Sequence, residues 1–448
     1  MKILFCCESY WPSRGGVQEV IRQIAERMAA AGHDVGVATR KQPDRASDNH
    51  NGVRIHEFAV GGNLVAGMQG EVARYQKFIT SFDGDAILIK AAQQWSFDAL
   101  WPVLDDIKVR KVFVPCGFSC LYEPEFARYF AELPQILRKF DHLIFYAEKY
   151  RDIDFAKAHG ITTFSIIPNG ASEVDFGRVA DGSLRSKLGI AKDDFLFLTV
   201  GTPVNAKGHM QVGEAFAQMD VGARNATLIL NGSWPKPSRR SLLPVLRLFL
   251  RPQTVMKGLV VLYKEGWRSV WERLFPKPPP LVAAPEKPAA TAGRGQPIKE
   301  VKGTKRTLCI DLPRPDVIRA FLESDLFVFA SKVEYSPLVL FEAAAAGTPF
   351  LTVPAGNAAE IVRWTGGGQL CPAEVDEKNY VKVSPAVLAA EMQRMMTSPA
   401  LLKQLGAAGQ QAWRDRFTWA TIAKSYERVL RGEKVSAPLL PQANAMSD

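Results

Sequence analysis

The sequence predicts an α/β protein with two doubly wound, Rossmann-like domains that face a cleft. Two series of short strand-like runs alternate with helical patterns along the 448 residues. The turn-rich stretch IPNGASEVDF (167–176) separates the two series. Because ligands of doubly wound sheets bind beyond the carboxyl ends of the strands, we expect the functional site in the crevice between two facing sets of strand ends.

The first domain is expected over residues 1–168 and opens with a strand, a glycine loop, an amphipathic helix and a second strand. Apolar residues recur at helical spacing from Val17 to Met28, and Gly32 stands where a helix would end. DVGVAT (34–39) supplies the second strand. Further strands are predicted at 86–90, 111–115, 142–146 and 163–167.

The second domain is expected over residues 169–416, followed by a helix over 417–432 and a tail over 433–448. Residues 234–306 interrupt this domain as an insertion that contains 11 prolines. The strands of the domain are predicted at 195–201, 226–232, 307–313, 325–331 and 349–354.

The formal net charge of +10 is concentrated in the insertion. Residues 234–306 contain 16 Lys and Arg against 4 Asp and Glu, a net of +12, which leaves −2 for the rest of the chain. A body so close to neutral argues against a nucleic-acid-binding fold. Within 240–300, an apolar stripe from Met256 to Leu274 is flanked by basic residues, which is the pattern of a helix on a membrane surface. The alternative, a stripe that packs on the domain with its charges in solvent, stays open.

The chain is expected in the cytoplasm, with the inner face of the cell membrane as a peripheral location. No run of about 18 apolar residues is present, and the apolar start ILFCC (3–7) is cut short by Glu8, too early for a secretory leader. The six cysteines show no C-x-x-C pairing and no histidine at metal-ligand spacing. Neither a disulfide framework nor a metal site is therefore predicted.

A helix start is predicted in the stretch VEYSPLVLFEAAAAGTPF (333–350). Ser336 and Pro337 are a suitable N-cap and first-turn pair. We therefore expect a helix from residue 337 to about 346, ending at Gly347.

Two glutamates flank that helix start, with Glu334 before the helix and Glu342 inside it. Eight helical residues rise about 12 Å, farther than the roughly 5–9.5 Å between paired glycosidase carboxylates. The pair therefore suits the two ends of one long ligand, and the helix N-terminus between them suits a diphosphate. A nucleotide sugar has this layout, with ribose hydroxyls for Glu342 and sugar hydroxyls for Glu334. Lys207, after the strand that ends at Gly201, is placed to bind the same phosphates.

Together these stretches resemble the glycosyltransferase family 4 enzymes of the GT-B fold, over nearly all of the chain except 234–306. The E-x7-E stretch with its GTP tail is a fairly specific signature, whereas the glycine loop alone is a weak one. The other matching stretches are RGGVQEV (14–20), AAAGHDV (29–35), IPNG (167–170), the VG…KG segment (200–208), PAGNAAEIV (354–362) and FTWATIAKSYERVL (417–430).

The resemblance implies retaining transfer of a sugar from a nucleotide diphosphate donor held mainly by the second domain, with no cofactor and no metal. It implies that Glu334 contacts the donor sugar, Glu342 the ribose and Lys207 the diphosphate. It also implies that the helix of 417–432 crosses back onto the first domain, and that glycines let the first loop approach the phosphates closely. The other implied donor-site residues are Gly15, Gly16, Gly201, Thr202, Ser336, Pro337, Leu338 and Asn357.

Two positions depart from the family pattern. Thr202 stands where many members have an arginine that partners the lysine, and Arg14 and Arg363 are candidates to replace it. Cys116 stands where many members have a histidine that faces the sugars, and a thiol does not relay protons at neutral pH unless its pKa is lowered. Front-face retaining transfer needs no protein base, because the leaving phosphate takes the proton of the acceptor. Cys116 therefore stays a candidate catalytic position.

The expected function is a retaining glycosyltransferase that adds a sugar to a lipid-linked or polysaccharide acceptor in cell-envelope or exopolysaccharide synthesis. Two alternatives are a nucleotide-sugar epimerase of the same fold and a non-catalytic scaffold or binding protein.

Other features are expected to be structural. DGD (83–85) resembles a metal-binding D-x-D but precedes a strand, whereas a metal-bound donor would lie at a strand's end. DID (152–154) is expected on a solvated helix face. Trp95 is expected in the core and His209 in a structural role.

Overall fold

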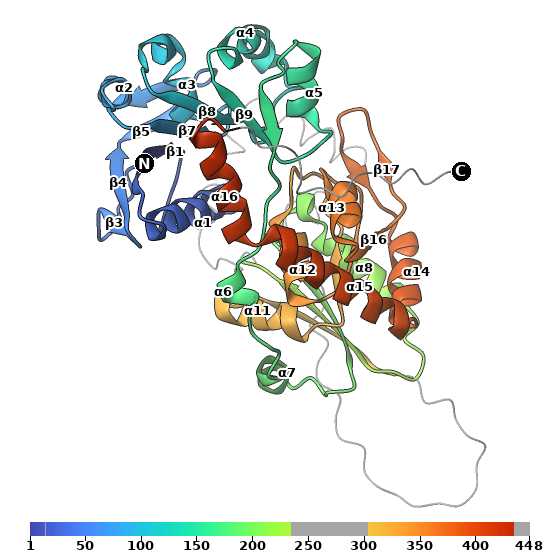
Figure 1. Cartoon of the computed structure of the whole chain (residues 1–448). Helices are drawn as coiled ribbons and strands as arrows, with labels where there is room; N and C mark the ends of the chain where they lie inside the picture. Colours follow the sequence, from blue (N-terminus) through green and yellow to red (C-terminus); the bar gives the residue numbers. More distant parts are fainter. Residues whose placement is uncertain (14, 234–302, 434–448) are drawn as a thin grey trace, which may run out of the picture. The chain divides into compact units, whose positions relative to one another are not determined.

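The computed structural model describes residues 1–13, 15–233 and 303–433 (Figure 1). The apolar stripe within the insertion and its predicted membrane role at 240–300 lie outside the described residues, as does Arg14. In the described part of the chain, no helix is long and apolar enough to cross a membrane.

The first domain is built on a mostly parallel eight-stranded sheet with the order β10-β9-β8-β7-β1-β2-β4-β3. Only the short β3 runs antiparallel to its neighbour. This arrangement confirms the predicted doubly wound sheet. The strands are β1 (Lys2–Cys6), β2 (Asp34–Arg40), β3 (Asn49–His50), β4 (Val53–Phe58), β7 (Ala86–Lys90), β8 (Arg110–Val114), β9 (His142–Phe145) and β10 (Phe164–Ile166).

Helices cover both faces of this sheet because its central strands are apolar on both sides. In β1, Ile3 and Phe5 pack in one core cluster with α1 (Gly16–Ala30), while Leu4 and Cys6 pack in another. The second cluster lies against the remaining helices of the domain. These are α2 (Val72–Thr80), α3 (Trp95–Asp98), the 3-10 helices η1 (Trp101–Asp106) and η2 (Pro124–Phe126), α4 (Ala127–Leu137) and α5 (Arg151–Ala158).

A hairpin of β5 (Val60–Asn63) and β6 (Gly67–Gly70) follows β4. The sequence prediction contained neither β4 nor this hairpin. Trp95 is fully buried in the core, as predicted.

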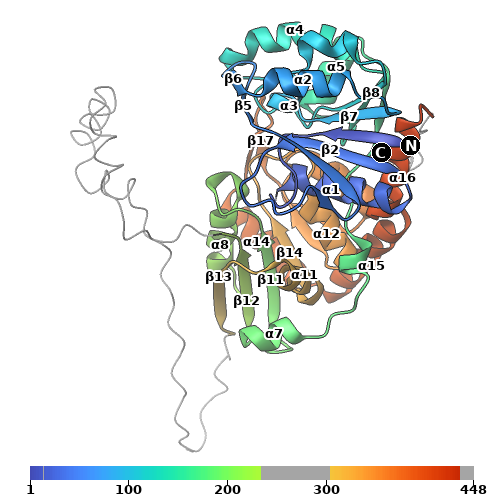
Figure 2. The same cartoon turned by 90° about the vertical axis from the view of Figure 1, so that its left-hand side faces the viewer.

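The second domain contains a six-stranded, fully parallel sheet with the order β13-β12-β11-β14-β15-β16. Figure 2 shows β13, β12, β11 and β14 side by side. β13 begins at Lys305, so the regular fold resumes before the predicted end of the insertion at 306. The strands are β11 (Phe195–Val200), β12 (Ala226–Asn231), β13 (Lys305–Ile310), β14 (Leu326–Phe329), β15 (Phe350–Thr352) and β16 (Gly368–Leu370).

Helices also surround the second sheet, and two strands form a separate small hairpin, β17 (Glu374–Val375) and β18 (Val381–Lys382). The helices are α6 (Glu173–Phe176), α7 (Ser183–Leu188), α8 (His209–Gln218), α11 (Arg314–Glu323), α12 (Leu338–Ala346), α13 (Ala358–Thr365), α14 (Pro385–Met396) and α15 (Pro399–Ala412).

The last helix, α16 (Trp419–Leu430), returns to the first domain and lies beside α1 (Figure 1). A π-helical turn over Trp413–Phe417 precedes it. Ile422, Tyr426 and Val429 of α16 are buried in the same core cluster as Ile3 and Phe5 of β1. The C-terminal segment therefore completes the core of the first domain.

Candidate active site

Lys207 lies in a tight loop at the carboxyl end of β11. The loop contains the 3-10 turn η3 (Asn205–Lys207) and ends at Gly208, which has φ 75° and precedes α8. The Lys207 ammonium forms an ion pair with the Glu334 carboxylate, which follows β14 on the neighbouring strand. Ser331 Oγ lies 3.0 Å from Glu334 Oε1 and 2.9 Å from Ala206 O, so it links the two loops. The structure thus brings together two residues that are 127 positions apart in sequence.

Gly208 is required by the backbone of this loop. A Cβ at Gly208 would lie 2.0 Å from Ala330 O, in a left-handed conformation that itself costs about 1–2 kcal/mol for other residues. Gly208→Ala should therefore lower the free energy of unfolding, measured in urea, well beyond that cost. Gly160 (φ 69°) has no atom within 4 Å of the same added carbon, so Gly160→Ala should lose only about 1–2 kcal/mol. Equal losses in the two variants would contradict the close approach of this loop to Ala330.

The N-terminus of α12 stands between the two glutamates without a side-chain cap. The predicted N-cap at Ser336 is wrong, because Pro337 takes that position with an extended backbone and α12 begins at Leu338. Ser336 Oγ is buried and has no hydrogen-bond partner among the described residues. A buried hydroxyl beside uncapped N–H groups is a suitable environment for an anion. The predicted helix end is confirmed, since Gly347 adopts φ 71° after Ala346.

The glycine loop of the first domain approaches this same helix start. A Cβ at Gly16 would lie 3.9 Å from Leu338 Cδ1. Gly15 is the N-cap of α1 in an extended conformation, and no side chain caps that helix either. Two helix N-termini, each with a partial positive charge, therefore lie close together.

Glu342 lies in the middle of α12 and is held by Arg314. Its carboxylate is 2.6 Å from Arg314 Nη2, which also lies 3.0 Å from Asp175 Oδ2. Burial raises the pKa of Glu342 from its usual value, and the Arg314 guanidinium opposes that shift. Glu19 of α1 raises the same pKa further. The sequence prediction did not include Arg314. Its position shortly after β13, at the carboxyl end of a strand, could have indicated a ligand-binding role.

Cys116 lies at the end of β8 in a strained loop. Its φ is 63°, and Phe118 nearby has φ 47°. Burial raises the pKa of the Cys116 thiol, although the neighbouring Lys90 opposes this shift. The thiol is therefore protonated at neutral pH. Lys90, which the sequence prediction does not include, is buried at the end of β7, donates a hydrogen bond to Tyr146 Oη and has a pKa lowered by burial.

Asp152 corrects the expectation of a solvated DID segment. The side chain is fully buried and accepts hydrogen bonds from the backbone N–H groups of Gly117, at 2.8 Å, and Ile153, at 2.9 Å. Burial raises its pKa to about 6. The expectation of a solvated Asp152 was wrong because this residue, in the first turn of α5, faces the loop after β8. The periodicity of a single helix does not reveal such a contact with another part of the chain.

The loop that carries Glu334 is anchored to the first domain through Tyr335. Its ring stacks between Tyr146, at 5.3 Å, and Tyr150, at 4.9 Å. Tyr335 Oη accepts a hydrogen bond from Tyr146 N at 3.0 Å, and Tyr150 Oη donates to Glu334 O at 2.5 Å. Asn357 is also buried here and donates from Nδ2 to Tyr146 O at 2.9 Å. Asn357 N also donates to Tyr335 O at 2.8 Å, so this predicted donor-site residue supports the loop around Glu334.

The remaining candidates have other surroundings. Thr202 is exposed, and Arg363 forms an ion pair with Glu148 at 2.7 Å, so this arginine does not join Lys207. Asp83 pairs with Lys2. His209 is buried with Nε2 3.2 Å from Asn231 O. Within the ranges that the structure describes, no group of three His, Cys, Asp or Glu side chains could hold a metal ion.

Comparisons with known proteins assign both domains. Residues 15–152 match the family described as "Glycosyl transferase 4-like domain", and residues 305–411 match "Glycosyl transferases group 1". The two matches together span more than half of the chain. A stretch of 135 residues is 30% identical to glycogen synthase of Mycobacterium tuberculosis (strain H37Rv), and it covers 29% of this chain and 30% of that relative.

Solved structures share the fold at low sequence identity. Sucrose-phosphate synthase from Thermosynechococcus elongatus has a TM-score of 0.64 at 17% identity, with 96% of this chain and 98% of that chain covered. Anabaena Alr3699/HepE in complex with UDP has a TM-score of 0.64 at 16% identity, with 96% and 100% covered. WaaG, a glycosyltransferase involved in lipopolysaccharide biosynthesis, has a TM-score of 0.57 at 17% identity, with 96% and 100% covered. The chain therefore belongs to the family 4-like glycosyltransferases and has the GT-B fold.

Proposed function

We propose that the chain is a retaining glycosyltransferase whose nucleotide sugar lies across the start of α12, from Glu342 to Glu334. The observation that carries this proposal is the pairing of Lys207 with Glu334 beside an uncapped helix N-terminus and the buried Ser336 hydroxyl. These groups supply cationic and hydrogen-bonding partners for a diphosphate, with a carboxylate on either side of it.

Each residue has a defined task in this arrangement. Lys207 and the N-termini of α1 and α12 stabilise the charge that develops on the leaving diphosphate. Glu342, oriented by Arg314, accepts hydrogen bonds from the ribose hydroxyls. Glu334 accepts hydrogen bonds from the donor sugar and holds its reacting carbon toward the first domain. Positive charge for the diphosphate comes from the chain itself, so we propose a transfer that uses neither a cofactor nor a metal ion.

The proton of the acceptor hydroxyl goes to the leaving phosphate in this proposal. Cys116 occupies the predicted catalytic position, but burial raises the pKa of its thiol, which makes it a poor base at neutral pH. Attack from the same face as the departing diphosphate then retains the configuration of the sugar. Cys116 shapes the site beside Lys90 and carries no proton in the reaction.

UDP-glucose is the first donor to test, because HepE structures are described in complex with UDP and with UDP-glucose. For the acceptor, we propose a growing polysaccharide or a lipid-linked glycan, made at the cytoplasmic face in envelope or exopolysaccharide synthesis. The similarity to glycogen synthase supports a glycan acceptor, and the similarity of fold to WaaG is compatible with an envelope role.

The purified chain should release a nucleoside diphosphate from one member of a panel of UDP-, GDP-, ADP- and dTDP-sugars, slowly even without an acceptor. Proton NMR of the first product should show the anomeric configuration of the donor. A product of inverted configuration would contradict the retaining mechanism. No consumption of any donor, together with no thermal stabilisation by any nucleotide, would contradict the donor site itself.

A further inference from the structure

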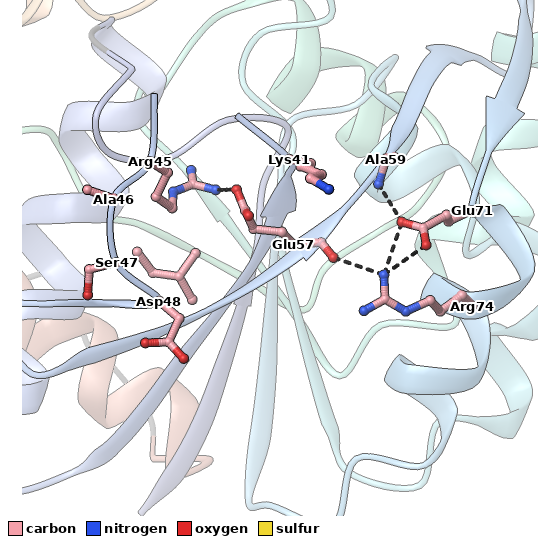
Figure 3. A pocket seen from close by; sticks show the side chains of 10 residues that line it. Lys41, Arg45, Ala46, Ser47, Asp48, Glu57, Ala59, Glu71 and Arg74 are labelled. Atoms are coloured by element: carbon pink, nitrogen blue, oxygen red, sulfur yellow. Dashed lines mark hydrogen bonds and ion pairs between the residues drawn. The ribbon is translucent and has the colours of Figure 1, made fainter. Parts of the chain in front are cut away.

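Arg151, the first residue of α5, is buried but has no acidic partner. The residue is only 4% exposed, and no carboxylate of the described residues forms an ion pair with its guanidinium. In contrast, Arg45 of the same domain, whose side chain is also buried, forms an ion pair with Glu57 (Figure 3). A buried charge without a partner of opposite sign destabilises the folded state. The position of Arg151 therefore indicates a role other than stability.

The guanidinium of Arg151 joins the two domains through hydrogen bonds. Its Nη2 donates to Lys378 O, in the turn between β17 and β18 of the second domain. Its Nη1 lies 3.4 Å from Ser119 O, in the loop after β8 of the first domain. Nε is buried and has no hydrogen-bond partner among the described residues. Both bonds therefore go to backbone carbonyl groups, one in each domain.

Three tyrosine rings surround the same guanidinium. Its carbon Cζ lies 5.1 Å from the ring centre of Tyr122, 5.7 Å from that of Tyr150 and 5.4 Å from that of Tyr380. A cation at this distance is attracted to the face of an aromatic ring, so the rings partly replace the missing carboxylate. Tyr380 belongs to the second domain and the other two tyrosines to the first. The ring contacts therefore join the two domains as well.

The turn that Arg151 contacts is held rigidly by Asp376. Its Oδ1 accepts hydrogen bonds from Lys378 N at 2.9 Å and from Tyr380 N at 2.8 Å. Asp376 N also donates to Tyr380 O at 3.0 Å. The two turn residues that meet the guanidinium are the same two that Asp376 fixes. The β17–β18 hairpin should therefore move as a unit when the guanidinium is lost.

The β17–β18 hairpin supports the loops of the proposed donor site. Val381 N donates to Lys332 O at 2.8 Å, and Lys332 N donates to Ala206 O at 2.7 Å. Ala206 directly precedes Lys207, and Lys332 lies two positions before Glu334. A continuous series of contacts thus connects the buried guanidinium with the ion pair of the donor site.

We infer that Arg151 is a positioning residue for sugar transfer, which holds the β17–β18 hairpin against the first domain and thereby keeps Lys207 and Glu334 in their productive arrangement. This inference rests on the proposed function, which assigns both residues to the donor. When the hairpin is displaced, both side chains are still present but misplaced. A misplacement of about 1 Å can lower a rate about 100-fold.

The first test compares the full wild-type chain with Arg151→Met, which keeps the length of the side chain but removes its charge and its hydrogen bonds. The kcat for donor consumption should fall about 10- to 100-fold. The KM for the donor should change less than about threefold, because every group proposed to bind the donor is retained. Arg151→Lys keeps the charge and one donated bond, so it should recover part of the lost kcat.

Arg224→Met is the matched control for this test. The Arg224 guanidinium also donates to a backbone carbonyl, Asp193 O at 3.1 Å, and lies 4.9 Å from the ring centre of Phe195. All three residues belong to the second domain, at the start of β11 and away from the proposed donor site. The control variant should retain the wild-type kcat and KM.

Hydrogen exchange tests the contact directly and does not need an active enzyme. Protection of the backbone amides of residues 374–382 should fall at least about 10-fold in Arg151→Met and less in Arg151→Lys. It should keep the wild-type level in Arg224→Met. The midpoint of urea unfolding should stay near the wild-type value in Arg151→Met, because the substitution also removes a buried unpaired charge.

Wild-type protection of the β17–β18 hairpin in both Arg151 variants would overturn the inference. A loss of kcat with an equal rise in KM for the donor would do so as well. A wild-type chain that consumes its donor, with unchanged kcat in both variants, would remove only the role of Arg151. A wild-type chain that consumes no donor would contradict the proposed function, and the loss of protection would still show that Arg151 holds the hairpin.

Discussion

Replacing Lys207 with alanine should lower kcat for donor consumption by about 100- to 1,000-fold, the usual cost of removing one preorganised group that stabilises developing negative charge. The ammonium is fixed by Glu334 and by the tight turn that ends at Gly208, so it needs little reorganisation when the diphosphate departs. Glu334→Gln should lower kcat as well, because it removes the partner that holds Lys207 and the acceptor of hydrogen bonds from the sugar.

Lys192→Ala is a matched control for this prediction. Lys192 is exposed and lies just before β11, whereas Lys207 follows the other end of the same strand. The control therefore removes an equal charge at the end of the strand that faces away from the proposed donor site. It should leave kcat within about twofold, in keeping with the small effects of surface substitutions. A Lys207→Ala enzyme with kcat near the wild-type value would remove Lys207 from the catalytic machinery.

The second large effect is expected at Glu342. Glu342→Gln should raise KM for the donor about 10- to 100-fold, because a hydrogen bond to a buried charged group contributes about 1.5–3 kcal/mol. Arg314 keeps Asp175 as an ion-pair partner in this variant, so the fold should survive. Glu214→Gln, an exposed glutamate on α8, is the matched control and should leave KM unchanged.

A pair of inhibitors shows whether Glu342 binds the ribose. The wild-type enzyme should be inhibited more strongly by the nucleoside diphosphate of its donor than by the 2′,3′-dideoxy analogue. The Glu342→Gln variant should lose most of that preference, because the ribose hydroxyls then have no carboxylate to which they can donate hydrogen bonds. An unchanged preference would place the ribose elsewhere, even if KM had risen.

The sequence predicted most of the fold because each parallel strand is an apolar run bounded by turn residues. It missed β4 and the following hairpin because VRIHEF (53–58) mixes charged and apolar residues near the sheet edge. The sequence prediction placed the N-cap of α12 one residue too early, because Ser followed by Pro is a common helix start. In the structure, Pro337 has an extended backbone and is itself the N-cap, so α12 begins at Leu338.

The candidate site could be predicted where its residues share one short stretch, and less well where they come from distant parts of the chain. Glu334 and Glu342 were predicted from their spacing around a helix start. Tyr335 contacts Tyr146, 189 positions away, and Arg314 contacts Asp175, 139 positions away. No local pattern encodes such contacts. The buried position of Asp152 likewise depends on the loop after β8.

The most direct test of the donor site is a crystal structure of the chain with the nucleoside diphosphate of its donor. We expect the diphosphate at the N-terminus of α12, within hydrogen-bond distance of Lys207 Nζ and Ser336 Oγ, and the ribose hydroxyls on the Glu342 carboxylate. A nucleotide bound away from α12, with Lys207 still paired only to Glu334, would contradict the assignment.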